Sequence, residues 1–150
     1  MNTAHPASVL GNAARPALEA IARTARFQPG QVVFVEGAPT PFFGYLESGR
    51  VALRLYVPGR GSHTVLTLER GDVIGWSAVV PPYRVTAEAV ALQPTDIRAY
   101  DAASLRDLLA GDRTLAAELL PIVLRSVSER LTTSWHQLLD LFEAAPMEPW

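Results

Sequence analysis

Residues 71–87 read GDVIGWSAVVPPYRVTA, and this stretch says more about the architecture than any other part of the chain. A strand-like run ends at Gly75, where the missing side chain lets the backbone approach a ligand closely. The amides of residues 76–78 would then be unpaired donors at a helix start, an arrangement that suits phosphate. Arg84 adds a planar, permanently charged fork for a bidentate phosphate contact. The pattern predicts an anion site, although it is equally compatible with a strand, a core-filling turn and a surface arginine.

The composition indicates one globular domain and excludes several kinds of site. Of the 150 residues, 49% are apolar and 19% are charged, so we expect a single domain over residues 1–150 with a sizeable core. The formal net charge of −2 provides no basic surface, so no direct nucleic acid binding is expected. The absence of cysteine excludes disulfides and zinc–thiolate sites.

The start of the chain and its hydropathy predict a cytoplasmic protein. The first residues lack the basic region and the following apolar stretch of a signal peptide. No uninterrupted apolar run is long enough to cross a bilayer, so we expect no membrane association.

Turn signals divide the chain into three parts. Residues 16–26 have the apolar spacing of a short helix, with Pro16 suited to its first position. Residues 27–100 read as short strands between glycines and prolines, which is typical of a sandwich or barrel. Residues 102–143 read as helical, and Asp101 is suited to capping the first of these helices. The expected strands are residues 31–34, 43–47, 51–56, 64–68, 85–90 and 97–100.

The last helix has an apolar seam that predicts a homodimer. The members of this seam recur every three or four residues, as on a helix face that packs against another helix. One small β-domain cannot cover the whole seam, although packing on its own domain is the simpler alternative. Pro121 is unfavourable inside a helix and predicts a kink or a fresh start near Leu120. The seam consists of Leu120, Leu124, Val127, Leu131, Trp135, Leu138 and Phe142.

Several segments together resemble the cyclic-nucleotide-binding domain of bacterial catabolite activator proteins and of protein kinase A regulatory subunits. The resemblance covers residues 17–142 and rests on the order and spacing of the glycines. It implies a mainly β fold with flanking α. An N-terminal helix precedes an antiparallel β jelly roll (a double-stranded β-helix), which contains a short helix in its phosphate cassette and leads to a long C-terminal helix that often dimerises. The matching segments are FQPGQVVF (27–34), EG (36–37), YLESGRVAL (45–53), LTLERGD (66–72) and the cassette GWSAVVPPYR (75–84). The GWS and PPYR of this cassette also resemble those of short bacterial proteins.

The family's site differs from this chain at two positions. Family members have a glutamate after the cassette glycine, which receives the ribose 2′-hydroxyl, whereas this chain has Trp76. They have serine or threonine after the arginine, whereas this chain has Val85, and Thr86 comes one residue late and is expected on the opposite face of a strand. The lost charged hydrogen bond is worth about 1.5–3 kcal/mol. Cyclic AMP and cyclic GMP, the ligands that the resemblance implies, are therefore expected to bind weakly if they bind.

The ligand-binding residues that the resemblance implies lie in the cassette, just after it and on the long helix. Trp76 either fills the sugar position or stacks on an aromatic or purine ligand. Thr132, Thr133 and Ser134 are candidate base contacts, with ordinary helix-surface polarity as the alternative. The candidate residues in and after the cassette are Gly75, Trp76, Ser77, Ala78, Arg84, Val85 and Thr86.

No residue pattern indicates catalysis. His5, His63 and His136 lack metal-ligand spacing, and no serine has a nucleophile-elbow motif, so we expect no enzyme activity, metal or cofactor. The resemblance implies a regulatory ligand-binding module that acts on an unidentified partner protein. The alternative is a degenerate domain with a structural or interaction role. Family transcription factors have a helix-turn-helix after the long helix, and this sequence shows none, so we expect no DNA-binding domain.

Overall fold

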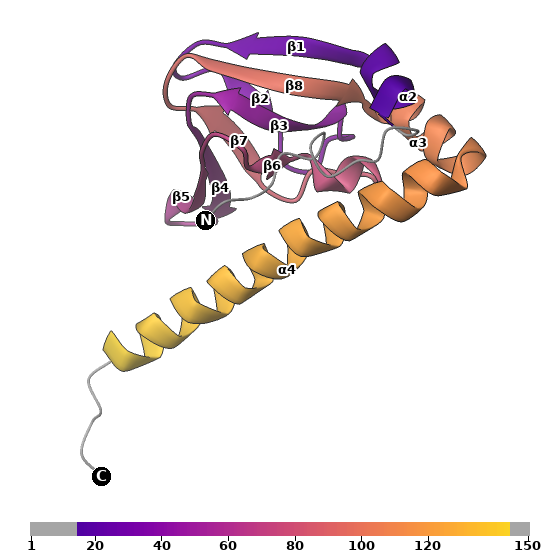
Figure 1. Cartoon of the computed structure of the whole chain (residues 1–150). Helices are drawn as coiled ribbons and strands as arrows, with labels where there is room; N and C mark the ends of the chain where they lie inside the picture. The colour runs from indigo at the N-terminus through magenta and orange to yellow at the C-terminus, as the bar shows by residue number, and fades with distance from the viewer. Residues whose placement is uncertain (1–14, 145–150) are drawn as a thin grey trace.

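The computed structural model describes residues 15–144, which form two four-stranded antiparallel sheets with helices on one side (Figure 1). The sheets pack face to face as a jelly roll, with the orders β1-β8-β3-β6 and β2-β7-β4-β5, so the predicted fold class is confirmed. The strands are β1 (Ala22–Phe27), β2 (Val32–Phe34), β3 (Phe42–Ser48), β4 (Val51–Val57), β5 (Gly61–Leu68), β6 (Val73–Ile74), β7 (Glu88–Ala91) and β8 (Thr95–Asp101). The helices are α2 (Arg15–Ala20), the 3₁₀ helix η1 (Trp76–Ala78), α3 (Ala102–Gly111) and α4 (Arg113–Ala144).

Strand β3 is buried on both faces because the second sheet covers one face and the helices cover the other. Successive side chains of a strand point to opposite faces. Phe42 and Leu46 join the core between the sheets, whereas Phe43 and Tyr45 join a second core beneath the helices. This second core holds α3 and α4 against η1, and its members on α3 and α4 are Ala102, Leu105, Leu115, Leu119 and Val123.

The N-terminal segment differs from the helix predicted over residues 16–26. Helix α2 ends at Ala20, and β1 pairs with β8 from Ala22 opposite Tyr100 to Phe27 opposite Thr95. Helical spacing is a weak local preference that tertiary contacts override. Here the hydrogen bonds come from a strand far along the chain, so no local pattern indicates them.

All six predicted strands are present, with shifted ends. Strand β7 begins only at Glu88, although the prediction began at Val85. The amide of Val85 donates to the Ala38 carbonyl oxygen at 2.9 Å, and its own carbonyl accepts from Gly37 at 2.8 Å. Val85 is therefore bound to the loop after β2. The strand-like run before Gly75 is β6.

Helix α4 is continuous through Pro121, so of the two alternatives predicted near Leu120, a kink or a fresh start, the fresh start is wrong. Proline removes a single helical amide donor. Leu119 and Val123, on either side of this position, are both buried in the second core and hold the helix in place. Packing of an apolar face outweighs the local cost of the proline.

Side-chain caps fix the starts of both C-terminal helices. Oδ2 of Asp101 accepts a 3.0 Å hydrogen bond from the amide of Ser104, which confirms the predicted cap of α3. Oδ1 of Asp112 accepts a 3.0 Å hydrogen bond from the amide of Leu115 at the start of α4. Each bond satisfies an amide that has no partner within the first helical turn.

Candidate functional site

Packing within the protein requires a glycine at position 75. Its φ is 78°, and a Cβ built there would lie 2.2 Å from the Phe42 carbonyl oxygen and 3.1 Å from the Phe34 ring. Both neighbours belong to the jelly roll, so the backbone at Gly75 lies close against the protein's own core.

The cassette turn uses one of the amides that were expected to face an anion. The amide of Ala78 donates to the Gly75 carbonyl oxygen at 2.9 Å, so this expected donor is already paired. Ser77 is buried, and its hydroxyl lies 2.7 Å from the Thr40 hydroxyl in the loop before β3. Ser77 therefore fixes the cassette to the scaffold.

Arg84 is exposed and contacts the loop after β2. Its Nη1 donates to the Gly37 carbonyl oxygen at 2.9 Å, and its backbone forms an isolated β-bridge with Pro39. The next residue, Val85, is buried in the core between the sheets. The guanidinium thus lies in solvent at the cassette exit, where a single backbone carbonyl holds it.

Arg106 of α3, which no sequence pattern indicated, contacts the cassette both at its first turn and near its end. Its Nη1 donates to the Ala78 carbonyl oxygen at 2.8 Å, and its guanidinium carbon lies 4.5 Å from the centroid of the Tyr83 ring. Tyr83 adopts a φ of 61°, a left-handed conformation that is uncommon for residues with a side chain. No local signal indicates this pairing, because its members lie on different elements.

A cavity of about 320 Å³ lies between the cassette and α4. It brings together Trp76 and Thr86 with Thr133 and Ser134, which were predicted as ligand or base contacts. Thr86 lies outside any strand and lines this cavity, whereas Val85 before it is buried in the core between the sheets. The other residues that line the cavity are Leu55 of β4, Val65 and Leu66 of β5, Ala87, and Val127, Arg130 and Leu131 of α4.

The other predicted site residues do not line this cavity. Arg84, Ser77 and Val85 contact the loops and cores described above. Thr132 is exposed on α4, and its hydroxyl donates to the Ser128 carbonyl oxygen at 3.0 Å. Of the three candidate base contacts, Thr133 and Ser134 therefore line the cavity, and Thr132 does not.

The hydroxyls and the cation on α4 are already bonded within the protein. Thr133 Oγ1 donates to the Glu129 carbonyl oxygen and Ser134 Oγ donates to the Arg130 carbonyl oxygen, each at 2.9 Å. Nη2 of Arg130 donates to the Val73 carbonyl oxygen. Burial lowers the pKa of Arg130 to about 10, and the nearby Asp72 carboxylate partly opposes this shift. Arg130 thus remains protonated at neutral pH.

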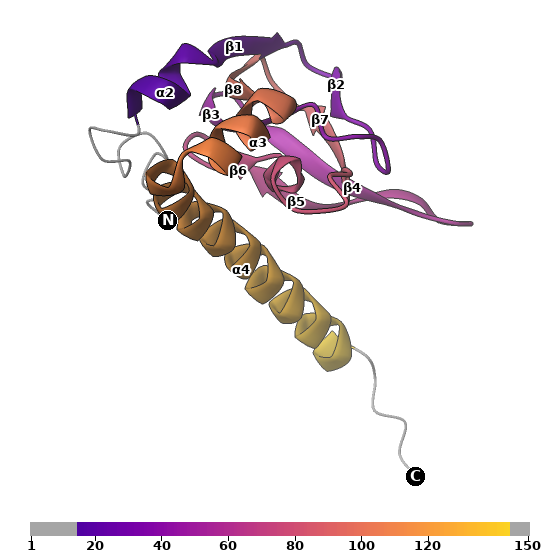
Figure 2. The same cartoon turned by 90° about the vertical axis from the view of Figure 1, so that its right-hand side faces the viewer.

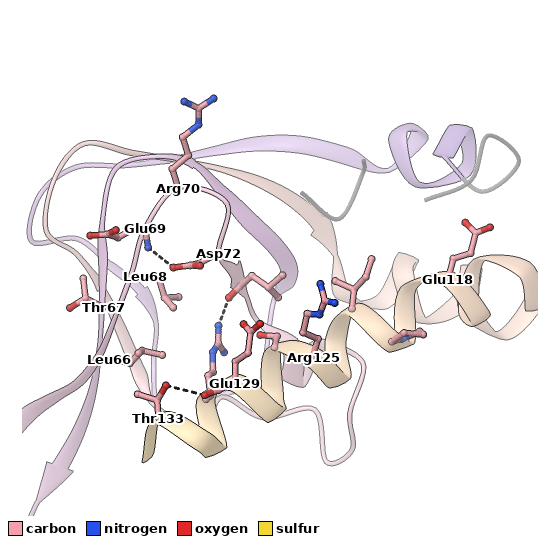
Figure 3. Close-up of a pocket in the computed structure, with 15 residues that line it drawn as sticks. Leu66, Thr67, Leu68, Glu69, Arg70, Asp72, Glu118, Arg125, Glu129 and Thr133 are labelled. Atoms are coloured by element: carbon pink, nitrogen blue, oxygen red, sulfur yellow. Dashed lines mark hydrogen bonds between the residues drawn. The ribbon is translucent and has the colours of Figure 1, made fainter. Parts of the chain in front are cut away.

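A larger cavity of about 510 Å³ lies on the other side of Arg130, between β5, the loop that follows it and α4 (Figure 3). Asp72 Oδ2 accepts a 2.8 Å hydrogen bond from the Glu69 amide, which fixes this loop. In the close-up, Arg70 points away from the helix. Leu66, Arg130 and Thr133 border both cavities, and the larger one has charges of both signs: Glu69, Asp72, Glu118 and Glu129 with Arg70, Arg125 and Arg130.

The apolar seam of α4 is largely exposed in the single chain. The last turns of the helix extend past both sheets (Figure 1, Figure 2). The exposed fractions are 68% for Leu124, 59% for Trp135, 53% for Leu138 and 70% for Phe142. Val127 and Leu131 also border the cavity beside Trp76, so the seam and the cavity share two side chains.

Within residues 15–144, no group of three His, Cys, Asp or Glu side chains is arranged to hold a metal ion. His5 lies outside this range, and His63 and His136 are exposed. None of the helices described in this range is both long and apolar enough to cross a membrane.

The sequence profile of the cyclic nucleotide-binding domain matches residues 24–112. No curated protein matches the chain at a significant level.

Several solved structures have the same fold. A cyclic nucleotide-binding protein from Geobacter metallireducens GS-15 is 25% identical, with a TM-score of 0.73 over 83% of this chain and 89% of its own. A cyclic nucleotide-binding domain from Methylobacillus flagellatus KT is 21% identical, with a TM-score of 0.79 over 94% and 78% of the two chains. The Thermus thermophilus catabolite activator protein is 20% identical, with a TM-score of 0.68 over 92% and 63%. The chain belongs to the cyclic nucleotide-binding domain family, whose members are typically non-catalytic regulatory modules and whose fold implies ligand sensing.

Proposed function

We propose that this protein is a non-enzymatic sensor in which a small ligand binds between the cassette and α4, and α4 transmits the response within a homodimer. One observation carries the proposal: Trp76 of the cassette and Thr133 of α4 line the same cavity. A molecule in this cavity would contact both elements at once. It would therefore favour the arrangement of cassette and helix that fits it, which is how differential binding shifts a conformational equilibrium.

Arg84 is the proposed charged contact for a phosphate on the ligand. Its present bond to the Gly37 carbonyl is a single exposed contact. A phosphate oxygen would replace that neutral acceptor with a charged one, and such charge-assisted bonds are roughly twice as strong. Trp76 stands where the family glutamate would accept a ribose hydroxyl, so cyclic AMP or cyclic GMP would bind more weakly than in members that have the glutamate.

The seam of α4 is the proposed dimer interface. Its exposed leucines and aromatic rings are large apolar side chains that a second copy of the same helix can cover. Val127 and Leu131 belong to the seam and also border the cavity. A ligand that displaces either side chain would therefore change the packing between the two copies.

Calorimetric titration of the natural protein and of Arg84→Leu with cyclic AMP tests the ligand part of this proposal. We expect weak binding by the natural protein and loss of most of this affinity in the variant. The fold should remain intact, because the Arg84 side chain is exposed. Arg70→Leu, which removes another exposed arginine, should bind as the natural protein does. Equal binding by the natural protein and Arg84→Leu would exclude the role assigned to Arg84.

The second candidate function is a structural or protein-interaction module that binds no nucleotide. The replacement of the family glutamate by Trp76 and the internal bond of Arg84 favour it. Native mass spectrometry of the protein purified from cells distinguishes the two functions. A bound small molecule supports the sensor, whereas a protein that is free of small molecules and does not bind cyclic AMP in the calorimeter supports the second function.

A further inference from the structure

The larger cavity, of about 510 Å³, is separate from the cavity of the proposed sensor. It lies between β5, the loop of residues 69–72 and α4, and no residue of the cassette (75–84) lines it (Figure 3). Its volume is within the ~300–1,000 Å³ that is usual for small-molecule sites. Its walls combine apolar and charged side chains, so a matching ligand has an apolar body and charged groups.

Apolar side chains from the sheets and from α4 form one part of the wall. Leu68 and Val73 are buried, and Ile122 is half-buried on the helix. Transfer of an apolar group from water to such a wall is favourable. The apolar members are Leu66 and Leu68 of β5, Val73 of β6, and Pro121 and Ile122 of α4.

Two successive turns of α4 present a polar patch to the same cavity. Arg125 and Ser126 lie on one turn, and Glu129 and Arg130 follow each of them by four residues, on the same helix faces. The two turns are about 5.4 Å apart along the helix axis. Figure 3 shows Arg125 and Glu129 on the side of α4 that faces the loop. Donors and a carboxylate acceptor are therefore within reach of one small molecule.

Ser126 is the buried polar residue of this patch. It is 8% exposed and borders the cavity, and its hydroxyl has no hydrogen-bond partner among residues 15–144. The hydroxyls of Thr132, Thr133 and Ser134 on the same helix each donate to the carbonyl four residues earlier. The Ser126 hydroxyl is thus available to donate to a ligand, and a buried hydroxyl without a partner is unfavourable.

The charged groups of the patch are also available. Within residues 15–144, neither Arg125 nor Glu129 forms an ion pair. The Arg130 guanidinium donates to the Val73 carbonyl oxygen, and an arginine has five N–H donors, so others remain. A ligand can therefore pair with these groups without breaking an existing ion pair.

The balance of charge disfavours a ligand that carries only one sign. Four carboxylates and three guanidiniums line the cavity, and Arg70 points away from the helix in the close-up. A simple anion would lie near the excess of carboxylates, which repel it. A simple cation would leave the donors of Arg125 and Ser126 without an acceptor. A molecule with both charges complements both groups.

We propose that this cavity binds an α-amino acid with a large apolar side chain, in its zwitterionic form. The ligand carboxylate accepts from the Ser126 hydroxyl and the Arg125 guanidinium, and the ligand ammonium donates to the Glu129 carboxylate on the next turn. The apolar side chain packs on Leu68 and Ile122. Both ends are held by charge-assisted hydrogen bonds, which are the stronger kind. This site goes beyond the proposed sensor function and does not depend on it.

The proposed dimer leaves this cavity open. Val127 and Leu131 of the seam are two positions before and after Glu129. Two residues turn an α-helix by about 200°, so these side chains point about 160° away from Glu129 around the helix. A second copy that covers the seam therefore does not cover the polar patch.

Calorimetry of the full chain with three matched molecules tests the ligand class. We expect L-phenylalanine to bind the natural protein. Hydrocinnamate, which lacks the ammonium, and phenethylamine, which lacks the carboxylate, should each bind about tenfold or more weakly, because each loses a charge-assisted contact. Equal binding of all three would show that the ring alone is recognised, and the proposal would be wrong.

Two charge-removing variants should separate the two ends of the ligand. Arg125→Gln should weaken L-phenylalanine and hydrocinnamate by about tenfold and leave phenethylamine unchanged. Glu129→Gln should weaken L-phenylalanine and phenethylamine and should not weaken hydrocinnamate. The matched controls are Arg113→Gln and Glu143→Gln, at exposed positions of α4 outside the lining, and both should bind as the natural protein does.

Ser126→Ala provides a test with little effect on the helix, because alanine is the best helix former. We expect it to weaken L-phenylalanine and hydrocinnamate, whose carboxylates lose a donor, and to leave phenethylamine unchanged. If the affinity for L-phenylalanine is the same in Ser126→Ala, Arg125→Gln and the natural protein, the amino acid binds elsewhere and the proposal fails.

The outcomes also distinguish this proposal from the sensor function. If cyclic AMP binds the natural protein and L-phenylalanine does not bind at millimolar concentration, the amino-acid site is wrong and the sensor function stands. If L-phenylalanine binds with the expected response to Arg125→Gln and Glu129→Gln while cyclic AMP does not bind, the amino-acid site stands without the nucleotide.

Discussion

The guanidinium carbon of Arg106 lies 4.5 Å from the centroid of the Tyr83 ring, and Nη1 of the same side chain donates to the Ala78 carbonyl oxygen at 2.8 Å. One side chain of α3 therefore holds the turn at the start of the cassette and the aromatic residue near its end. Helix α3 also packs on α4 within the second core. The position of the cassette and the position of the long helix are thus linked through Arg106.

Arg106→Leu should lower the free energy of unfolding by about 2 kcal/mol, because it removes a charged hydrogen bond and a cation–π contact. Arg106→Lys should lose less, since an ammonium can keep one of the two contacts. Urea denaturation measures both. Arg60→Leu, at an exposed hairpin turn, is the control and should change stability little. If Arg106→Leu lowers the free energy of unfolding as little as Arg60→Leu does, the contacts of Arg106 do not stabilise the fold.

Gly75→Ala and Gly59→Ala form a matched pair. Both glycines have positive φ, 78° and 79°, so each alanine incurs the left-handed backbone cost of about 1–2 kcal/mol. Only at Gly75 would the new Cβ also clash, at 2.2 Å from the Phe42 carbonyl oxygen, whereas nothing lies within 4 Å at Gly59. We expect Gly75→Ala to be the more destabilising of the two by at least ~2 kcal/mol in urea denaturation. Equal losses would mean that the cassette start is not held against β3.

Leu138→Glu should prevent formation of the proposed dimer. Leu138 is 53% exposed on the seam and lines neither cavity, unlike Leu131, so its substitution tests assembly separately from ligand binding. Sedimentation at micromolar concentration should give a dimer for the natural protein and a monomer for the variant. The dimer of the variant would bury an unpaired glutamate, which the monomer leaves in solvent. Leu92→Glu, at an exposed leucine after β7, should remain dimeric. If the natural protein sediments as a monomer, the proposed interface is wrong.

Asp101 should make stability depend on pH at the start of α3. Hydrogen bonds from the Ser104 amide and hydroxyl lower the pKa of Asp101 below its usual value. The carboxylate therefore stabilises the fold above the usual aspartate pKa, and this contribution is lost as the pH falls through the lowered value. Asp101→Ala should cost about 1 kcal/mol at pH 7 and progressively less in acid. Thermal unfolding across pH measures this loss, with Asp140→Ala, at an exposed position on α4, as the control. If the stability difference between Asp101→Ala and the natural protein does not change with pH, the cap is contradicted.

The local patterns of the sequence predicted most of the architecture. Turn signals at glycines and prolines predicted a sandwich or barrel, the family resemblance implied the jelly roll, and the three- and four-residue spacing after Leu120 predicted the long helix. The Asp101 cap was also predictable. These features depend on the backbone freedom of glycine, on helical periodicity and on short-range hydrogen bonds, all of which lie within a few residues along the chain.

The tertiary structure decided everything that depends on residues far apart in the sequence. It made a strand of residues 22–27 because β8 offers an edge to pair with, and it carried α4 through Pro121 because Leu119 and Val123 are buried. It also paired the Arg84 side chain with the Gly37 carbonyl oxygen and placed Thr86 in the lining of the cavity beside Trp76. The chain alone determined which groups are available, whereas packing in three dimensions determined which of them are already paired and which remain to meet a ligand, because each partner comes from a different element.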